Sequence, residues 1–289
     1  MLDWDDVRHL LAVRRGASLA KAARALRTNA TTVGRRITQL EERLGVKLFD
    51  RTSRGWTPTE ACARLLPHAE RMEQEAFALE RISAARDPSL EGTVHVTTTE
   101  AIATRYLMPH LGDLRARHPG IELVLSCAER RLDLGRREAD VAIRLMRPSE
   151  PDLVARRLMR LSLALYASVD YLERRGRIAK DSDFAGHDLV SFIEGRPSLP
   201  ETEWLAQNCP GGRVVFRCNS VSTLAEAIRE GIGIGLAPRI VGDRDEGLVR
   251  LDTPNPPEPR EVWLAYHRDI EPSPRVRAVI DFLAGTLVD

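Results

Sequence analysis

SLAKAARALRTNATTVGRRITQLEERLGVKLFDRTSR, residues 18–54, is the stretch that decides the fold of the amino-terminal region. Its first part carries one apolar face at helical spacing, formed by Leu19, Ala22, Ala23 and Leu26. Ser18 immediately precedes this face, and a serine in that position can cap a helix by accepting a backbone N–H. We therefore expect a short helix that begins directly after Ser18.

A second helix is expected after a short polar turn. Its inward face is formed by Val33, Ile37, Leu40 and Leu44. Asn29, or Thr28 before it, is placed to cap this helix, and Gly45 is placed to end it. Arg35 and Arg36 fall on the outward face. Two helices joined in this way are typical of a helix-turn-helix whose second helix enters the DNA major groove, with a plain helical hairpin as the alternative.

Basic charge is concentrated in this part of the chain. Between Arg14 and Arg54 there are eleven Lys and Arg residues against three Asp and Glu, whereas the whole chain has a formal net charge of +1. Such a local excess is the electrostatic footprint of a surface that binds phosphates. A solvated charged face explains any single arginine, but it explains the cluster less well.

A short hairpin, or wing, is expected after the second helix. It begins with the apolar pair Leu48 and Phe49. Its tip is polar and basic, with Arg51, Ser53 and Arg54. A tip of this composition can contact the phosphate backbone beside the groove.

Three ordered motifs run through this region. They are Trp4-Asp5-Asp6, then Ser18-Leu19-x-x-Ala22-Ala23-x-x-Leu26, then Leu40-Glu41-Glu42-x-Leu44-Gly45-Val46-x-Leu48-Phe49-x-Arg51. Together they resemble the amino-terminal domain of LysR-type transcriptional regulators. The resemblance implies a winged helix-turn-helix that binds double-stranded DNA, a homodimer or homotetramer, and RNA polymerase as a further candidate partner.

The sequence departs from the family pattern at the start of the second helix. Family members commonly have Ser-Gln-Pro there, whereas this chain has Asn29-Ala30-Thr31, with Gly34 where a serine is usual. The glutamine that could read a base edge is therefore missing. Thr31, Thr32 and Arg35 remain as candidates for base contacts, and Arg36 is expected on phosphate. The full set of expected DNA-binding residues is Ser18, Asn29, Thr31, Thr32, Arg35, Arg36, Arg51, Ser53 and Arg54.

A long helix is expected over residues 59–86. Its seam alternates three and four residues apart and is apolar up to its last member: Cys62, Leu65, Ala69, Met72, Ala76, Leu79 and Ser83. A heptad seam favours pairing with a second copy of the helix, and packing on its own domain's core is the alternative. Pro67 predicts a bend in this helix or its effective start. In the resembled family this helix dimerises, which implies contacts through Leu65, Ala69, Met72, Ala76 and Leu79.

From Thr93 onward, short strands alternate with helices. Strands are expected near residues 94–97, 121–126, 140–145, 161–168, 189–192, 213–217, 232–237 and 261–267, and helices near 107–114, 132–137, 169–175, 224–230 and 275–287. This alternation predicts a mostly parallel sheet in an α/β domain. The resembled family has two lobes here, like those of type II periplasmic binding proteins. By analogy, the chain crosses between lobes near Leu161–Ala164 and again near Trp263–Tyr266.

The predicted fold class is an α+β multidomain protein. It consists of a winged helix-turn-helix over residues 1–58, a linker and dimerisation helix over 59–88, and an effector-binding α/β domain over 89–289. Lobe I of the last domain is expected over about 89–162 and 266–289, and lobe II over about 163–265.

Two helix N-termini, one from each lobe, are expected to face an effector in the cleft between the lobes. The first offers Thr98 and Thr99, and the second begins at Ser220 and includes Val221. Because helix N-termini present free N–H groups and favour negative charge, a small carboxylate is the expected effector.

Two alternatives remain open for this site. Glu100 would repel an anion unless it points away or pairs, with Arg144 as the candidate partner, and a neutral or cationic effector fits better if Glu100 faces the cleft. Thr98, Thr99 and Ser220 can also be ordinary helix caps with nothing bound.

The sequence gives no support to catalysis, a metal site or a cofactor. The seven histidines show no metal-ligand spacing, and neither a Gly-x-Ser-x-Gly nor a Walker sequence is present. Gly231, Gly233 and Gly235 follow a helix and enter a strand, which is the reverse of a dinucleotide fingerprint. We therefore expect a regulator, not an enzyme, whose operator binding responds to a small molecule. The alternative is an α/β enzyme or solute-binding protein with an amino-terminal assembly module.

A cytoplasmic location is expected. The first six residues are acidic and lack an apolar signal core, and no uncharged apolar run approaches the ~18 residues of a membrane span. The cysteines lie far apart, at Cys62, Cys127, Cys209 and Cys218, with no Cys-x-x-Cys. This spacing favours reduced thiols over a disulfide framework or a zinc site.

Overall fold

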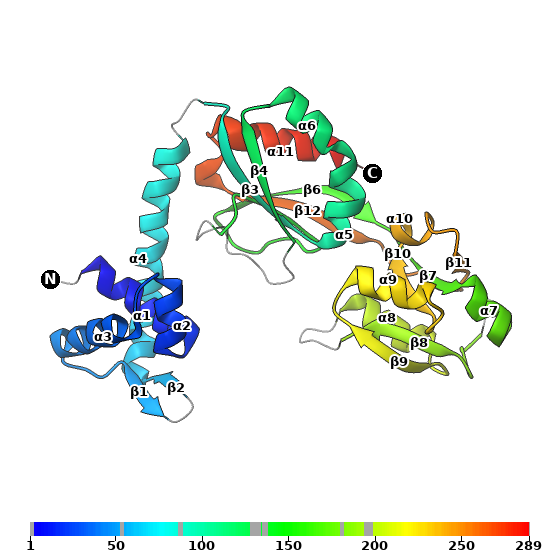
Figure 1. Ribbon diagram of the computed structural model, residues 1–289, viewed down its shortest axis with the longest axis horizontal. Helices are drawn as coiled ribbons and strands as arrows, with labels where there is room; N and C mark the ends of the chain where they lie inside the picture. The colour runs from blue at the N-terminus through cyan, green and yellow to red at the C-terminus, as the bar shows by residue number, and fades with distance from the viewer. Residues whose placement is uncertain are drawn as a thin grey trace. The chain divides into compact units, whose positions relative to one another are not determined.

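The computed structural model describes residues 3–52, 55–85, 89–127, 134, 138–179, 182–193 and 199–288. The chain forms two compact units, Met1–Ser83 and Ala84–Asp289, each with a core of its own (Figure 1). The long helix that was expected as a separate linker over residues 59–88 belongs to the first unit over most of its length.

The first unit contains the predicted helix-turn-helix and wing. Its elements are α1 (Trp4–Gly16), α2 (Leu19–Ala25), α3 (Ala30–Leu44), β1 (Phe49–Thr52), β2 (Gly55–Pro58) and α4 (Glu60–Ala85). The Ser18 hydroxyl caps α2 by accepting the Lys21 N–H at 3.2 Å. The Asn29 side-chain oxygen caps α3 by accepting the Thr32 N–H at 2.7 Å. Both predicted caps are therefore confirmed, and Gly45 ends α3 with a left-handed φ of 67°.

The helices α1, α2 and α3 share one apolar core. Its fully buried members include Val7, Leu11, Val13, Ala22, Val33, Ile37, Leu40 and Leu48. Leu44 was predicted to face this core, but it is 38% exposed. The prediction was wrong because Glu41, which is 5% exposed, takes the buried position in the last turn of α3.

Glu41 joins α3 to the start of the wing. One carboxylate oxygen accepts the backbone N–H groups of Leu48 at 2.8 Å and Phe49 at 3.2 Å. The other accepts the Lys47 ammonium at 2.8 Å. Burial alone would raise the pKa of Glu41, but the hydrogen bonds from Lys47, Leu48 and Phe49 outweigh it and lower the pKa below its ordinary value.

The long helix α4 starts at Glu60 and continues through Pro67 to Ala85. The predicted late start at Pro67 is therefore wrong, while the bend stays a prediction. Cys62 and Ala69 are buried in the core of the unit, so the first half of the predicted seam packs on its own domain. Glu73, also buried, receives both terminal nitrogens of Arg15 on α1, at 2.9 and 2.5 Å. For this half of the helix, the alternative of packing on its own domain's core is the correct one.

Lobe I of the second unit is a five-stranded sheet with helices. Its elements are β3 (Gly92–Thr98), α5 (Glu100–Ile102), a π-helical turn (Ala103–Leu107), a 3-10 turn (Met108–His110), α6 (Leu111–Arg117), β4 (Ile121–Cys127), β5 (Val141–Arg144), β6 (Leu153–Leu161), β12 (Arg260–His267), a 3-10 turn (Arg268–Ile270) and α11 (Pro274–Thr286). The strand order is β4-β3-β5-β12-β6. The helix predicted over residues 132–137 lies outside the described residues, except for Leu134.

The sheet is mixed, which corrects the expectation of a mostly parallel one. Strand β3 runs parallel to β4 and β5, whereas β12 runs antiparallel to β5 and β6. The antiparallel half arises because β6 leads out of the lobe and β12 leads back into it, so both carry the connections to lobe II. Strand β6 was not predicted, since the paired Arg156 and Arg157 interrupt its apolar alternation.

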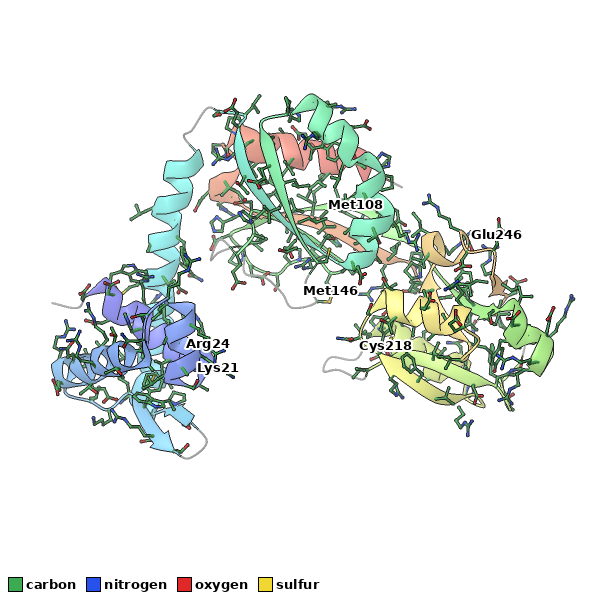
Figure 2. The ribbon with its side chains drawn as sticks, viewed as in Figure 1. Lys21, Arg24, Met108, Met146, Cys218 and Glu246 are labelled. Atoms are coloured by element: carbon green, nitrogen blue, oxygen red, sulfur yellow. The ribbon has the colours of Figure 1, made fainter. Side chains whose placement is uncertain are left out.

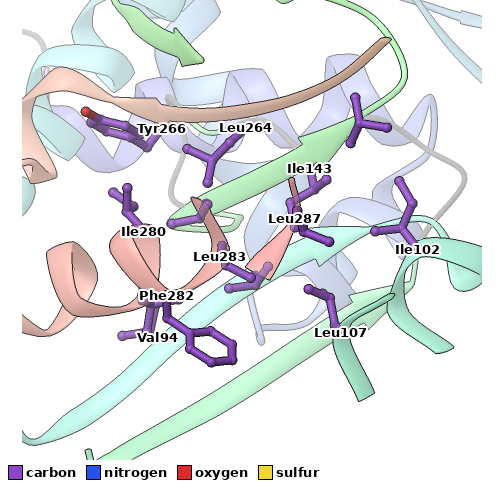
Figure 3. Close-up of a cluster of buried hydrophobic side chains, with 14 of the residues drawn as sticks. Val94, Ile102, Leu107, Ile143, Leu264, Tyr266, Ile280, Phe282, Leu283 and Leu287 are labelled. Atoms are coloured by element: carbon purple, nitrogen blue, oxygen red, sulfur yellow. The ribbon is translucent and has the colours of Figure 1, made fainter. Parts of the chain in front are cut away.

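The core of lobe I lies between this sheet and the closing helix. Figure 3 shows Val94 of β3, Ile143 of β5 and Leu264 of β12 together with Ile280 and Leu283 of α11, and all five side chains are buried. These residues come from both ends of the domain sequence. The core therefore requires the chain to return to lobe I after building lobe II.

Lobe II contains the intervening residues. Its elements are β7 (Leu163–Ser168), α7 (Val169–Arg175), β8 (Asp188–Phe192), α8 (Pro200–Asn208), β9 (Arg213–Cys218), α9 (Val221–Arg229), β10 (Gly235–Pro238), α10 (Arg239–Gly242) and β11 (Leu248–Leu251). Strand β7 is central in an antiparallel β10-β7-β11 sheet, and β8 pairs in parallel with β9. The helices α8 and α10 and the strand β11 were not predicted.

The chain crosses between the lobes twice. The first crossing is at Ser162, between β6 and β7, as predicted. The second was predicted near Trp263–Tyr266, but β12 already pairs with β6 in the lobe I sheet from Arg260 onward. The return therefore precedes Arg260, and lobe II ends earlier than residue 265.

The contact between α3 and the wing predicts a pH-dependent stability. Replacing Glu41 with Gln should destabilise the first unit by about 1.5–3 kcal/mol at neutral pH, because two buried N–H groups lose a charged acceptor. Since the pKa of Glu41 is lowered by folding, its carboxylate contributes stability above the ordinary Glu value of 4.5, and this is lost as the pH falls through the lower folded value. The variant should therefore lose less stability on acidification than the wild type.

Hydrogen exchange of α3 amides in the full chain, at neutral and acidic pH, measures this difference. Glu42→Gln is the matched control, because Glu42 is the exposed neighbour on the same helix. Equal protection of α3 in the Glu41 and Glu42 variants would contradict the assigned role.

Candidate DNA-binding surface and effector site

The first turn of α3 presents polar side chains to solvent. Thr31 and Arg35 are exposed and Thr32 is half-buried, while Val33 and Ile37 on the opposite face are fully buried. The Asn29 carboxamide oxygen is occupied by its cap hydrogen bond. The three residues predicted to contact bases therefore share the outward side of the helix, and Asn29 positions them.

Arg36 does not point outward, contrary to the prediction. Its Nη1 lies 3.2 Å from Asp6 and 3.4 Å from Asp3, both at the start of α1. Arg43 donates to the second oxygen of Asp6. Asp6 is completely buried, so these contacts fix α3 on α1. The reason for the error is that a carboxylate distant in sequence attracts the Arg36 side chain inward.

The wing carries an aromatic contact at its base. Arg51 and Trp56 face each other across β1 and β2, and the Arg51 guanidinium lies 4.8 Å from the centre of the Trp56 ring. Arg51 also donates to the Thr38 hydroxyl of α3 at 3.4 Å and remains exposed. This stacking holds the cation beside α3. Ser53 and Arg54, the other predicted wing residues, lie outside the described residues.

Gly55 allows the wing to approach the helices. Its φ is +124°, and a side chain there would lie 2.5 Å from the Ala17 carbonyl oxygen. The same oxygen accepts the Trp56 N–H at 3.0 Å. The wing is thus hydrogen-bonded to the turn between α1 and α2. Only glycine fits at position 55, the first residue of β2.

Three further basic residues belong to this surface, although the sequence analysis did not single them out. Lys21 and Arg24 project from α2 (Figure 2), and Arg27 lies in the turn before α3. All three are exposed, and within the described part of the chain none of them forms an ion pair. The first helix of a helix-turn-helix crosses the DNA backbone, where such residues meet phosphates. The local charge excess was the signal that could have identified them.

The second half of α4 exposes apolar side chains. Met72 is 40% exposed and Leu79 is 73% exposed, while Ala76 is half-buried. The predicted seam thus divides: Cys62 and Ala69 face the unit's own core, and Met72 and Leu79 face outward. Leu65 packs against that same core, and the side chain of Ser83 lies outside the described set.

The predicted effector residues of lobe I lie where β3 ends. The Thr99 hydroxyl accepts the Ile102 N–H at 3.4 Å and caps α5, which is the alternative role considered for it. Thr98 is fully buried, and its hydroxyl has no hydrogen-bond partner among the described residues. A buried hydroxyl without a partner is uncommon and calls for a water molecule or ligand.

Glu100 and Arg144 have different neighbours in the structure. Glu100 is exposed and close enough to Cys127, at the end of β4, to add to the burial effect that raises the pKa of that thiol. Arg144 ends β5 and donates to the Thr97 hydroxyl at 2.8 Å. The suggested pairing of Glu100 with Arg144 is therefore not observed, and Arg144 is held beside the strand that leads to Thr98.

The effector residues of lobe II lie at the start of α9. The Ser220 hydroxyl accepts the Thr223 N–H at 3.3 Å, which confirms the predicted cap, and Val221 is the first residue of the helix. Helix α9 is in contact with α5. The two helices that begin at the predicted effector residues, one from each lobe, therefore lie side by side.

A buried ion pair near the second crossing was missed by the sequence analysis. Arg260, at the start of β12, contacts Glu201 of α8 at 2.7 and 2.9 Å, and both side chains are nearly buried. Arg260 also donates to the Leu145 carbonyl at 3.3 Å. This pair ties lobe II to the end of β5 in lobe I. The two partners are 59 residues apart in the chain, so no local sequence pattern predicts the ion pair.

The two units define a class of protein in which a winged helix-turn-helix is joined to a two-lobed α/β domain. Residues 4–63 match the model of the bacterial regulatory helix-turn-helix protein, lysR family, and residues 88–287 match the LysR substrate binding domain. The chain belongs to the LysR family of transcriptional regulators. Members of this family bind DNA and small-molecule effectors and form oligomers, and they are regulators, not enzymes.

Similarity extends along the full length of known regulators. The Mau operon transcriptional activator of Paracoccus denitrificans is 30% identical over 290 residues, which cover 100% of this chain and 98% of the relative. The structure of CrgA, a LysR-type regulator from Neisseria meningitidis, is similar with a TM-score of 0.62 and 27% identity, covering 100% of both chains. Full-length CbnR complexed with its target DNA shares the fold, with a TM-score of 0.59 and 17% identity over 99% of this chain and 100% of that chain. None of the described helices is both long and apolar enough to span a membrane.

Proposed function

We propose that the first unit recognises its operator by placing α3 in the major groove, with Thr31, Thr32 and Arg35 at base edges. The observation that carries this proposal is the exposed basic surface of α2, α3 and the wing, which no carboxylate neutralises at Lys21, Arg24, Arg27 or Arg35 within the described part of the chain. Threonine hydroxyls and an arginine fork are suitable groups for base edges.

Phosphate contacts are assigned to residues around this helix. Arg51 is exposed beside α3, and Lys21 and Arg24 occupy the helix that crosses the backbone. Ser18 caps α2, which leaves it a positioning role. Arg36 is a weaker candidate than the sequence suggested, because Asp6 and Asp3 already engage it. Ser53 and Arg54 extend the proposal to the wing tip.

The assignment of Arg51 predicts a change in salt dependence. Arg51→Ala should weaken binding to all DNA sequences alike and reduce the slope of log K against log salt by about 0.9, the value for one phosphate contact. Arg35→Ala should instead alter the preference between operators, by about 1–3 kcal/mol at one base pair. Fluorescence anisotropy over a salt series measures both effects.

Arg117→Ala is the control for charge, since it removes one exposed guanidinium from α6 in the second unit. Its slope should equal that of the wild type. An unchanged slope in Arg51→Ala would remove the wing from the interface.

We propose that the second half of α4 pairs with the same helix of another chain. Met72 and Leu79 expose apolar side chains seven residues apart, which is one heptad. Ala76 lies between them, and the earlier seam residues are already used by the unit's own core. Pairing of two chains in this way gives two recognition helices and a site with two half-sites. A tetramer needs a further interface, for which we assign no residues.

This pairing predicts the effect of a charge in the seam. Met72→Glu should weaken the dimer by about 30-fold or more, equivalent to about 2 kcal/mol, because a carboxylate would be buried without a partner. Sedimentation of the full chain measures the association. Gln74→Glu adds the same charge at an exposed position outside the seam and should leave the dimer intact. An undiminished dimer in the Met72 variant would place the interface elsewhere.

We propose that the second unit binds a small carboxylate near the starts of α5 and α9. The buried Thr98 hydroxyl without a partner among the described residues and the Arg144 guanidinium beside Thr97 favour an anion. The contact between α5 and α9, which start at Glu100 and Val221, supports the same choice, because helix N-termini favour negative charge. Glu100 is exposed at the start of α5, and it would oppose a negative ligand if it faced the cleft. Ordinary capping by Thr99 and Ser220 accounts for their hydrogen bonds but leaves Thr98 unexplained.

Titration calorimetry with a panel of small carboxylates tests this site. In the Thr99→Ala, Ser220→Ala double variant the affinity of the carboxylate found for the wild type should fall about tenfold or more, since two donors at the helix starts are lost. Thr93→Ala, at the other end of β3, should bind as the wild type does. Retained affinity in the double variant would place the effector elsewhere.

We also propose that the protein works in the cytoplasm, where DNA and small metabolites are both accessible. The Paracoccus relative is named a transcriptional activator. If this chain acts in the same way, RNA polymerase is the partner that its operator complex contacts.

A further inference from the structure

A separate hollow lies at the junction of the two lobes. Its volume is about 280 Å³. The residues that line it come from lobe I, the first crossing and the region of α10: Tyr106, Arg160, Ser162, Arg239, Ile240, Asp243 and Arg244. Hereafter this is the junction pocket. The residues proposed for the carboxylate effector do not line it.

The junction pocket is lined by more basic than acidic side chains. Three arginines line it, and Asp243 is the only carboxylate among its described lining residues. Asp243 is already engaged, because it accepts the Tyr166 hydroxyl at 2.6 Å, Arg239 at 2.9 Å and Arg250 at 3.3 Å. Arg239 and Arg250 thus share this carboxylate, and Asp243 forms no ion pair with Arg244 within the described part of the chain.

Several donors in the pocket lack partners. Within the described part of the chain, no hydrogen bond or ion pair engages the Arg244 guanidinium, the Tyr106 hydroxyl or the Ser162 hydroxyl. Burial raises the pKa of Tyr106, and nearby Arg244 offsets this only in part. The Tyr106 hydroxyl therefore keeps its proton at neutral pH and can donate.

We propose that the junction pocket binds a small oxyanion with at least two negative charges. Guanidinium groups bind phosphate and carboxylate oxygens through paired, charge-assisted hydrogen bonds, and hydroxyls complete such sites. The volume suits a small ion or headgroup, because pockets for larger ligands exceed about 300 Å³. A cation is disfavoured by the three arginines, and an apolar ligand by the unpaired hydroxyls.

The position of the pocket gives this anion a regulatory role. Tyr106 and Arg160 belong to lobe I, whereas Arg239 and Arg244 belong to lobe II, and the Arg239 N–H is bonded to the Ser162 carbonyl at 2.9 Å. An anion held by both sets stabilises the lobe arrangement that brings them together. The junction pocket is thus a second input to the regulator, separate from the carboxylate site.

Calorimetric titration of the full-length protein with inorganic phosphate, sulfate and malonate, at constant ionic strength, tests this proposal. Saturable binding of at least one of these anions is expected, with mutual competition where more than one binds. Arg244→Ala should weaken anion binding about tenfold or more. Tyr106→Phe should weaken it about threefold, because this substitution removes one hydroxyl and little volume. Arg115→Ala, an exposed arginine of α6, should have no effect.

Each outcome has a defined meaning. Binding of phosphate and sulfate alone identifies a phosphoryl-like group, and binding of malonate alone identifies a dicarboxylate; both support the pocket. The proposal is overturned if the wild type binds none of the three up to a concentration on the order of 10 mM. It is equally overturned if Arg244→Ala and Tyr106→Phe, with unchanged circular dichroism, bind as tightly as the wild type, or if Arg115→Ala weakens binding as much as Arg244→Ala.

Discussion

The buried carboxylate of Asp6 is the constraint on which the DNA-binding unit depends. Asp6 is completely buried on α1, and Arg36 and Arg43 reach it from two positions on α3. Removing either arginine leaves a buried charge short of a partner, which is strongly destabilising. The two contacts fix the rotation of α3 on α1 and therefore decide that Thr31 and Arg35 face outward.

A similar use of buried charge connects other elements. Glu41 binds the first residues of the wing, and Glu73 on α4 binds Arg15 on α1. In the second unit, Glu201 and Arg260 join the lobes near the return crossing. Each pair links elements that the apolar cores alone would leave free to slide, because apolar contact is not directional. Lys21, Arg24 and Arg35 form no such pair with a described residue, and we assign them to DNA.

The sequence was sufficient wherever the determinant is local. Ser18, Asn29 and Ser220 were recognised as caps because a cap and its N–H partner lie within three residues. The direction of the Arg36 side chain was not predicted correctly, because it depends on Asp6, which is 30 residues away in the chain. Strand β6 was missed because its alternation is broken by arginines and its pairing with β12 is distant. The first half of the α4 seam packs on the unit's own core, and pairing of the second half stays a prediction, since periodicity cannot distinguish a domain core from a partner helix.

Hydroxyl-radical footprinting on the DNA upstream of the protein's own gene tests the central claim most directly, namely that two copies of α3 read adjacent major grooves. At low salt, we predict two protected patches on one face of the duplex, separated by about 10–10.5 base pairs or a multiple of that distance. Raising the salt concentration should weaken both patches together. A single patch, or no protection of any DNA at low salt, would contradict the account.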